Sequence, residues 1–282
     1  MLPKPQWLRI RHTDTPFNED VVKLLAGLNL NTVCKEASCP NSHECFSLGT
    51  VTFMILGTNC TRNCRFCNVR YDATQQPDAS EPENVARAVK ELGLRYVVVT
   101  SVTRDDLPDG GAAHFAKTIR AIRQTAPGIA IEVLIPDLQG DVGALSVITG
   151  AAPDVISHNM ETVKSLYTEV RPQALYARSL EVLRSVKALA PGIHSKSAIM
   201  VGLGETKEQV YELFDDLREV GCEFLTIGQY LTPSKEHIPV RQYIEPSQFE
   251  EYAAAARQKG FSFVASAPFV RSSYRAWEAL GL

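Results

Sequence analysis

Several classes of protein are excluded by what this 282-residue sequence lacks. No stretch approaches the roughly 18 consecutive apolar residues of a membrane-spanning helix. The opening stretch MLPKPQWLRIRHTD has no apolar core of the kind that marks an export signal. The net charge of −3 provides no excess of basic residues for a nucleic-acid partner. We therefore expect a cytoplasmic protein without a membrane span or nucleic-acid partner, although a processed organelle precursor would have the same features.

Short motifs of several common enzyme classes are also missing. The sequence contains no G-x-G-x-x-G fingerprint, no P-loop, no G-x-S-x-G turn and no H-E-x-x-H zinc motif. Hydrolase and kinase interpretations therefore have no support. The sequence does have the composition of a globular protein with a core, because 45% of its residues are hydrophobic and 22% are charged.

Short apolar runs alternate with helical patterns from residue 53 onward. The runs lie at residues 53–56, 96–100, 129–135, 154–159, 195–201, 223–228 and 261–266. Most are apolar almost throughout, as parallel strands covered on both faces are. Repeated strand–helix units without a dinucleotide fingerprint predict an α/β fold with a complete or partial TIM-type barrel.

The first part of the chain differs from the rest. Residues 1–52 are polar, rich in cysteine and without periodicity, so we predict an N-terminal extension there and a barrel domain over residues 53–282. Within the barrel, Ser80 with Glu83 and Thr206 with Gln209 have the spacing of capping boxes. A third helix is expected to begin at Ser179.

Seven cysteines form two triplets and one singleton. They lie at positions 34, 39, 45, 60, 64, 67 and 222. A reducing compartment does not favour disulfides. Cys222 lies between a helix end and an apolar run, which predicts a small buried side chain.

The triplet Cys60, Cys64 and Cys67 directly follows the first predicted barrel strand, in the order C-x3-C-x2-C. Barrels of this kind place their chemistry at the carboxyl ends of their strands. Three thiolates are enough for a four-iron cubane cluster and leave one iron open to a ligand. A zinc knuckle or a set of redox cysteines is the alternative.

This spacing resembles the hallmark of the radical S-adenosylmethionine (SAM) superfamily, and Phe66 before the last cysteine also matches it. The resemblance implies a partial (β/α)6-type TIM barrel and a [4Fe–4S] cluster whose open iron binds SAM. Reduction then cleaves SAM to a radical that abstracts hydrogen from an unactivated carbon.

The second triplet has the spacing C-x4-C-x5-C at Cys34, Cys39 and Cys45. A zinc site completed by His43 is one interpretation of this spacing. The C-terminal stretch APFVRSSYRAW favours another, because it resembles the Arg-Ser-Ser-Tyr signature of lipoyl synthases. The segments TSVTRDDLPDGGA, SHNMETV, EVRP, KSAIMVGLGET and LTIGQYLTPS match the same family.

The resemblance to lipoyl synthases implies a sulfur-inserting enzyme. Such an enzyme adds two sulfur atoms, at C6 and C8, to an octanoyl chain attached to a protein. An auxiliary [4Fe–4S] cluster supplies the sulfur and is held by Cys34, Cys39, Cys45 and a serine, which corresponds to Ser273 rather than Ser272. Another sulfur-inserting radical SAM enzyme is the alternative.

The same resemblance implies a SAM pocket. Asn159 and Glu161 would reach the ribose or methionine end, and Arg171 would pair with the carboxylate. Thr100 and Ser101 end the second strand and would form part of the pocket wall. The alternative for Glu161 and Arg171 is an ordinary ion pair on a helix face.

Three kinds of partner are implied as well. We expect an octanoylated lipoyl carrier domain or protein, an electron donor such as flavodoxin or ferredoxin, and an iron–sulfur carrier. The carrier is needed because removing sulfide from the auxiliary cluster destroys that cluster. No catalytic residue beyond the cluster ligands is predicted.

Overall fold

The computed structural model describes residues 3–9, 16–37, 39–47 and 50–282. These residues divide into two compact units, each with its own strands and helices. Unit 1 holds the described residues within 1–10, 63–67 and 157–274, and unit 2 holds those within 11–62, 68–156 and 275–282. The predicted division at residue 52 rests on composition and stays a prediction.

Unit 2 contains a mostly parallel sheet. Its strands, in hydrogen-bonded order, are β1 (Asn31–Thr32), β2 (Thr52–Ile55), β5 (Tyr96–Ser101), β6 (Ala130–Leu134) and β7 (Val155–Ser157), with the unit boundary falling at the last residue of β7. Strand β1 pairs with β2 antiparallel, whereas β2 with β5 and β5 with β6 are parallel. A separate ribbon consists of β3 (Asn59–Cys60) and β4 (Arg70–Tyr71). Every residue of β2 is buried, which is why this strand is apolar on both faces.

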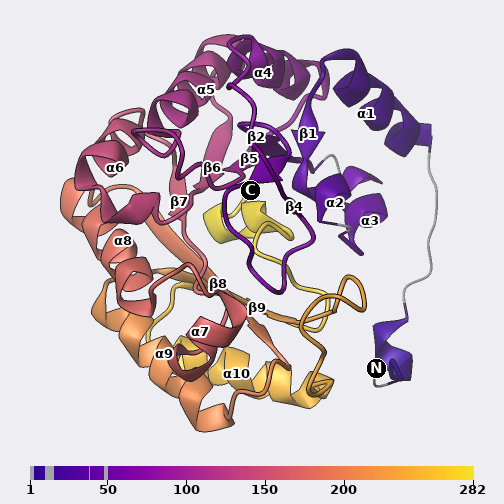
Figure 1. Cartoon of the computed structure of the whole chain (residues 1–282), viewed down its shortest axis with the longest axis vertical. Helices are drawn as coiled ribbons and strands as arrows, with labels where there is room; N and C mark the ends of the chain where they lie inside the picture. The colour runs from indigo at the N-terminus through magenta and orange to yellow at the C-terminus, as the bar shows by residue number, and fades with distance from the viewer. Residues whose placement is uncertain (1–2, 10–15, 38, 48–49) are drawn as a thin grey trace. The chain divides into compact units, whose positions relative to one another are not determined.

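Two helices of unit 2 connect parallel strands: α4 (Glu81–Glu91) joins β2 to β5, and α5 (Ala112–Thr125) joins β5 to β6. The other helices and 3-10 turns are α1 (Pro16–Gly27), α2 (Val33–Glu36), α3 (Ser42–Ser47), α6 (Val142–Thr149), η2 (Leu138–Gly140) and η4 (Ala276–Leu280). Figure 1 shows α4 and α5 next to each other on one side of β2 and β5. Turn η4, close to the C-terminus, packs against Tyr96, Val98 and Ala130.

Unit 1 continues the strand–helix alternation. Its elements are η1 (Gln6–Leu8), η3 (Lys164–Leu166), α7 (Tyr167–Val170), α8 (Tyr176–Leu189), β8 (His194–Val201), α9 (Lys207–Glu219), β9 (Phe224–Gln229), α10 (Pro246–Gln258) and β10 (Phe263–Ser266). Strands β8, β9 and β10 are parallel, and their register aligns Val201 with Gln229 and Phe263 with Phe224. One apolar core lies between these strands and the helices and includes Leu183, Phe214 and Leu225, none of which is exposed.

The strand predictions are confirmed, since each apolar run overlaps an observed strand. The capping box of Thr206 and Gln209 is also confirmed. One capping box and one helix start were wrong. Ser80 is the N-cap residue of α4, but its hydroxyl donates to Asp78 at 2.7 Å instead of capping the helix. Helix α8 begins at Tyr176, and Ser179 is a buried residue within it.

Cys222 is fully buried, as predicted. Burial raises the pKa of its thiol to about 12, so the side chain stays a neutral thiol. Among the described residues, no helix is both long and apolar enough to cross a membrane.

Candidate functional site

The loop that carries the C-x3-C-x2-C triplet begins at a fixed turn after β2. Leu56 has a φ of +68° and Gly57 a φ of +93°. The backbone N–H of Leu56 donates to Glu81 at 2.8 Å, and its carbonyl accepts from Arg104 at 3.1 Å. A Cβ at Gly111 would collide with the Leu56 side chain, so this position requires glycine. The chain therefore leaves β2 in one defined direction.

Cys60 lies on β3, at the beginning of the triplet. Its sulfur accepts backbone N–H groups from Arg62 at 3.4 Å and from Thr103 at 3.3 Å. These two contacts fix the position of the Cys60 sulfur at the beginning of the loop. Thr61 ties the same loop to the segment after β5, because its hydroxyl donates to the Thr103 carbonyl at 2.9 Å and accepts from Asp105 N–H at 3.1 Å.

Arg62 fastens this loop through two carboxylates. Its guanidinium donates to Asp105 at 2.7 and 2.9 Å and to Asp137 at 2.7 and 2.9 Å. The Arg62 side chain is 5% exposed and that of Asp137 is fully buried. Sequence reasoning missed these contacts because the partners lie 43 and 75 residues further along the chain. We call Arg62, Asp105 and Asp137 the Arg62 clamp.

Unit 1 holds the second half of the triplet by backbone contacts. Arg65 N–H donates to the Val170 carbonyl at 3.0 Å, and Ile238 N–H donates to the Arg65 carbonyl at 3.1 Å. His237, to which the sequence assigned no role, lies with its Nε2 3.0 Å from the carbonyl oxygen of Cys67. The loop that follows β9 therefore supports the chain around Cys64 and Cys67.

The second triplet, Cys34, Cys39 and Cys45, lies in unit 2 on and between the short helices α2 and α3. Burial, followed by the charge of Cys39, raises the pKa of Cys34 to about 12. Burial, followed by the charges of Cys34 and Cys39, raises the pKa of Cys45 to about 12. The three sulfurs are thus close enough to influence one another, and ionising them together requires a cation. This environment fits an iron–sulfur cluster, since an unaccompanied set of thiolates would be strongly disfavoured.

The structure gives no support to a single-ion site at these cysteines. Among the residues that it describes, no three His, Cys, Asp or Glu side chains converge on one point. The His43 side chain lies outside the described part, so the predicted zinc alternative stays untested at that ligand. A four-iron cluster does not need such convergence, because each thiolate binds a different iron. All seven cysteines are free of disulfides.

The C-terminal serine motif leads into a segment that contacts the second triplet. Arg275 forms an ion pair with Glu44 at 3.2 Å, one residue before Cys45, and its charge lowers the pKa of that cysteine. Ser273 lies two residues before Arg275 in the sequence. Ser272 makes a different contact and donates its hydroxyl to Asn159 Oδ1 at 3.0 Å.

The predicted SAM residues of unit 1 gather after β7. The Asn159 amide donates to Glu161 at 2.9 Å. Arg171 donates to the carbonyls of Asn159 and Met160 and to the Tyr167 hydroxyl, at 2.9, 3.3 and 2.7 Å. Burial raises the pKa of Glu161, although the nearby charge of Arg171 opposes this effect.

The alternative of an ion pair on a helix face was wrong for these residues. Glu161 forms an isolated parallel bridge with Ile199 of β8 and has a φ of +67°. A non-glycine residue in this left-handed region costs about 1–3 kcal/mol, and such strain is concentrated at functional sites. In unit 2, Thr100 donates to the Leu134 carbonyl at 2.9 Å. The Ser101 hydroxyl is buried without a hydrogen-bond partner among the described residues.

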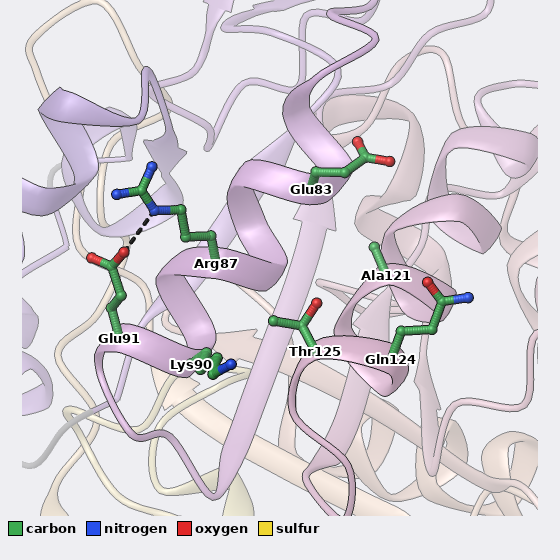
Figure 2. A pocket seen from close by; sticks show the side chains of 7 residues that line it. All are labelled: Glu83, Arg87, Lys90, Glu91, Ala121, Gln124 and Thr125. Carbon is green, nitrogen blue, oxygen red and sulfur yellow. Dashed lines mark hydrogen bonds and ion pairs between the residues drawn. The ribbon is translucent and has the colours of Figure 1, made fainter.

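A groove of about 610 Å³ on the outside of unit 2 does not belong to this chemistry. Figure 2 shows it between α4 and α5, with Arg87 bound to Glu91 along α4. The lining residues are Glu83, Arg87, Lys90, Glu91, Ala121, Gln124 and Thr125. None of the predicted site residues is among them. The groove is therefore ordinary helix surface with an i,i+4 ion pair.

Comparison with known proteins agrees with this arrangement. The family model of the radical SAM superfamily matches residues 54–217, which is more than half of the chain. The structure is similar to that of methylornithine synthase (PylB), with a TM-score of 0.54 and 14% identity, covering 92% of this chain and 86% of that one. It is also similar to HydG, a maturase of the [FeFe]-hydrogenase, with a TM-score of 0.59 and 13% identity, covering 88% and 63%.

The fold and the cysteine loop therefore define a member of the radical SAM superfamily. The lipoyl synthase of Alkaliphilus metalliredigens (strain QYMF) is 56% identical over 277 residues, which cover 98% of this chain and 96% of that protein. The lipoyl synthase of Caldicellulosiruptor saccharolyticus is 57% identical over 275 residues, with the same coverage. This chain belongs to the lipoyl synthase family.

The family confirms several predictions made from the sequence. The fold is the α/β partial barrel of the radical SAM kind, and the protein is a radical SAM enzyme of the lipoyl synthase type. Its cofactors are SAM and two [4Fe–4S] clusters. It acts on a lipoyl carrier substrate and requires a reductant.

Proposed function

We propose that this enzyme inserts sulfur at C6 and C8 of a protein-bound octanoyl chain, using one cluster at each cysteine triplet. Two separate sets of three cysteines, none of them in a disulfide, are the observation that carries this proposal. When bound, the first cluster supplies the electron for SAM cleavage and the second supplies the sulfide. Acid–base groups do not reach unactivated C–H bonds, so the protein's own part is to bind, orient and shield.

Cys60, Cys64 and Cys67 hold the first cluster. The two N–H donors at the Cys60 sulfur hold that side chain in place at the start of the loop. The Arg62 clamp keeps the loop in place, because the guanidinium donates hydrogen bonds to both carboxylates. Backbone contacts of Arg65 keep the second half of the loop in an equally defined conformation.

Cys34, Cys39, Cys45 and Ser273 hold the auxiliary cluster. The mutual effect of the cysteines on their pKa values supports a shared site. Arg275, which pairs with Glu44 beside Cys45, supports the participation of the serine motif two residues earlier. Ser272 is engaged with Asn159, which favours Ser273 as the fourth ligand.

Asn159, Glu161, Arg171, Thr100 and Ser101 contribute to SAM binding. Asn159 and Glu161 are linked by a hydrogen bond and offer polar groups to the ribose or the methionine end. Arg171 holds the backbone carbonyls of residues 159 and 160, so it shapes the pocket in addition to supplying positive charge. The buried Ser101 hydroxyl lacks a hydrogen-bond partner among the described residues, which supports a polar ligand beside it.

The finer assignments of partners extend this proposal. The substrate is an octanoylated lipoyl carrier domain or protein, flavodoxin or ferredoxin is the electron donor, and an iron–sulfur carrier rebuilds the auxiliary cluster. The location is cytoplasmic. Residues 1–52 form the extension that carries the auxiliary ligands, and residues 53–282 form the radical SAM domain with the C-terminal serine ligand.

The test is the iron and acid-labile sulfide content of protein purified without oxygen. About eight irons per chain should fall to about four in Cys34→Ala/Cys39→Ala/Cys45→Ala and in Cys60→Ala/Cys64→Ala/Cys67→Ala. The Cys222→Ala variant is the matched control and should keep about eight, because Cys222 is buried in the core of unit 1. About four irons in the wild type, unchanged by loss of the first three cysteines, would contradict the auxiliary site.

A further inference from the structure

A chain of hydrogen bonds joins the C-terminal serine motif to the predicted SAM residues. The Ser272 hydroxyl donates to Asn159 Oδ1 at 3.0 Å, and Asn159 Nδ2 donates to Glu161 Oε1 at 2.9 Å. All three residues belong to unit 1, and Ser272 lies 113 residues after Asn159. The chain ends on a carboxylate that the fold holds in a strained backbone conformation.

The backbone around Asn159 and Glu161 is held from two sides. Glu161 N–H donates to the Ala198 carbonyl at 3.0 Å, and the Glu161 carbonyl accepts from Met200 N–H at 2.9 Å. Arg171 holds the Asn159 carbonyl at 2.9 Å. These contacts place the main chain of this segment but leave the Asn159 side chain to be oriented by other groups.

Ser272 is a suitable group for that task because its own segment is well anchored. Gln229 N–H, at the end of β9, donates to the Pro268 carbonyl at 3.2 Å, and Val270 N–H donates to the Ala267 carbonyl at 3.0 Å. At Gly228, an added Cβ would collide with the Val270 carbonyl, so the segment lies directly against β9. The hydroxyl of Ser272 therefore approaches Asn159 from a rigid support.

The amide of Asn159 contacts both neighbours. Its NH2 group donates to Glu161 Oε1 at 2.9 Å. The amide oxygen then faces Ser272 and needs a donor, which the hydroxyl provides. With alanine at position 272 the amide oxygen would lose this donor, and the amide would rotate more freely in a site that is 9% exposed.

We propose that Ser272 is a positioning residue for SAM binding, which orients the Asn159 amide and, through it, the Glu161 carboxylate. This inference rests on the proposed function, in which Asn159 and Glu161 bind SAM. The two adjacent serines then have separate roles: Ser272 serves the SAM pocket, and Ser273 serves the auxiliary cluster. The hydroxyl of Ser272 acts through Asn159 and takes no part in bond breaking.

The experiment measures the dissociation constant of SAM and the iron content on the same anaerobic holoenzyme samples. Loss of one hydrogen bond to the amide should weaken SAM binding by about five-fold in Ser272→Ala, with about eight irons retained. Ser272→Thr keeps a hydroxyl and should restore binding to within about two-fold. Ser273→Ala is the matched control, and it should alter the auxiliary cluster while leaving SAM binding within about two-fold of the wild type.

Two further variants separate the possible failures. Asn159→Ala should weaken SAM binding, and adding Ser272→Ala to it should cause no further loss, because the serine acts through the amide. Wild-type SAM binding in Ser272→Ala, together with weaker binding in Asn159→Ala, would overturn the role of Ser272 alone. Unchanged SAM binding in Asn159→Ala would overturn the proposed pocket and this inference with it. Loss of auxiliary iron in Ser272→Ala would assign the ligand to Ser272 instead.

Discussion

Replacing Arg62 by methionine tests whether the Arg62 clamp holds the cysteine loop. Methionine retains much of the side-chain length but removes the charge and all four hydrogen bonds to Asp105 and Asp137. Asp137 has no exposed side-chain surface, so its carboxylate would remain buried without its cation. Asp105 is 29% exposed and would be partly stabilised by water.

The expected cost follows from this burial. Removing one partner of a buried ion pair destabilises a protein by about 3–5 kcal/mol, because the other charge stays in a medium of low polarity. For a chain of this size each kcal/mol lowers the melting temperature by about 2–4 °C. Arg62→Met should therefore lower the melting temperature by about 6–20 °C.

Differential scanning calorimetry on protein stripped of iron measures this cost without a contribution from cluster loss. Arg87→Met is the matched control, because Arg87 is 64% exposed and pairs with Glu91 on the surface of α4. That variant should lose only about 0.3–0.5 kcal/mol. A double variant, Arg62→Met with Asp137→Asn, should regain more than half of the loss, since it removes the unpaired charge.

Equal melting temperatures for Arg62→Met and Arg87→Met would refute the reasoning about the clamp. A second readout concerns function. In the Cys34→Ala/Cys39→Ala/Cys45→Ala background, Arg62→Met should bring the iron content well below about four per chain, because the loop of the first cluster has lost its fastening. Full iron content in that variant would show that the loop keeps its conformation without the clamp.

Two further predictions concern single positions. Gly228→Ala should destabilise the protein by about 1–3 kcal/mol, since its Cβ would collide with the Val270 carbonyl, whereas Gly192→Ala has no atom within 4 Å and should be neutral in the same melting experiment. The hydrogen bond from Arg104 lowers the pKa of Asp106 to about 2, below its usual 3.8. This carboxylate therefore stabilises the fold above about pH 4, and the contribution disappears as the pH falls towards 2. Because Asp106 is 35% exposed, Asp106→Asn should cost only about 1 kcal/mol at pH 7 and nothing near pH 2, and equal costs at both pH values would contradict this assignment.

Much of the fold could be predicted from the sequence because buried parallel strands leave a strong local signal. The run YVVVTS, for example, is β5, and five of its six residues are buried. The contacts that cap helices were less predictable. Ser80 has the spacing of a capping box, but its hydroxyl donates to Asp78. The capping-box pattern compares only residues 80 and 83, so it does not reveal a competing acceptor nearby.

The candidate site also combines motifs that the sequence reveals with contacts that only the structure shows. The two cysteine triplets could be recognised from spacing, since a loop that wraps a cluster needs its ligands close together in the sequence. The serine motif was suggested only by its resemblance to the lipoyl synthase signature. The contacts of His237 with the Cys67 carbonyl and of Arg62 with Asp137 could not, because the partners are 170 and 75 residues apart.

The sequence by itself determined the class of enzyme and its cofactors, because these follow from residue types at short spacing, and the two cysteine triplets stay its predicted cluster ligands. The tertiary structure alone decided how the surrounding residues are supported. It pairs Arg62 with two carboxylates, holds Glu161 in a left-handed backbone conformation and forms the hydrogen bond from Ser272 to Asn159. Such contacts depend on where distant strands end, and side-chain types along the chain do not encode which ends will meet. The hydrogen bond from Ser272 to Asn159 is therefore a property of the fold, because its two partners lie 113 residues apart in the sequence.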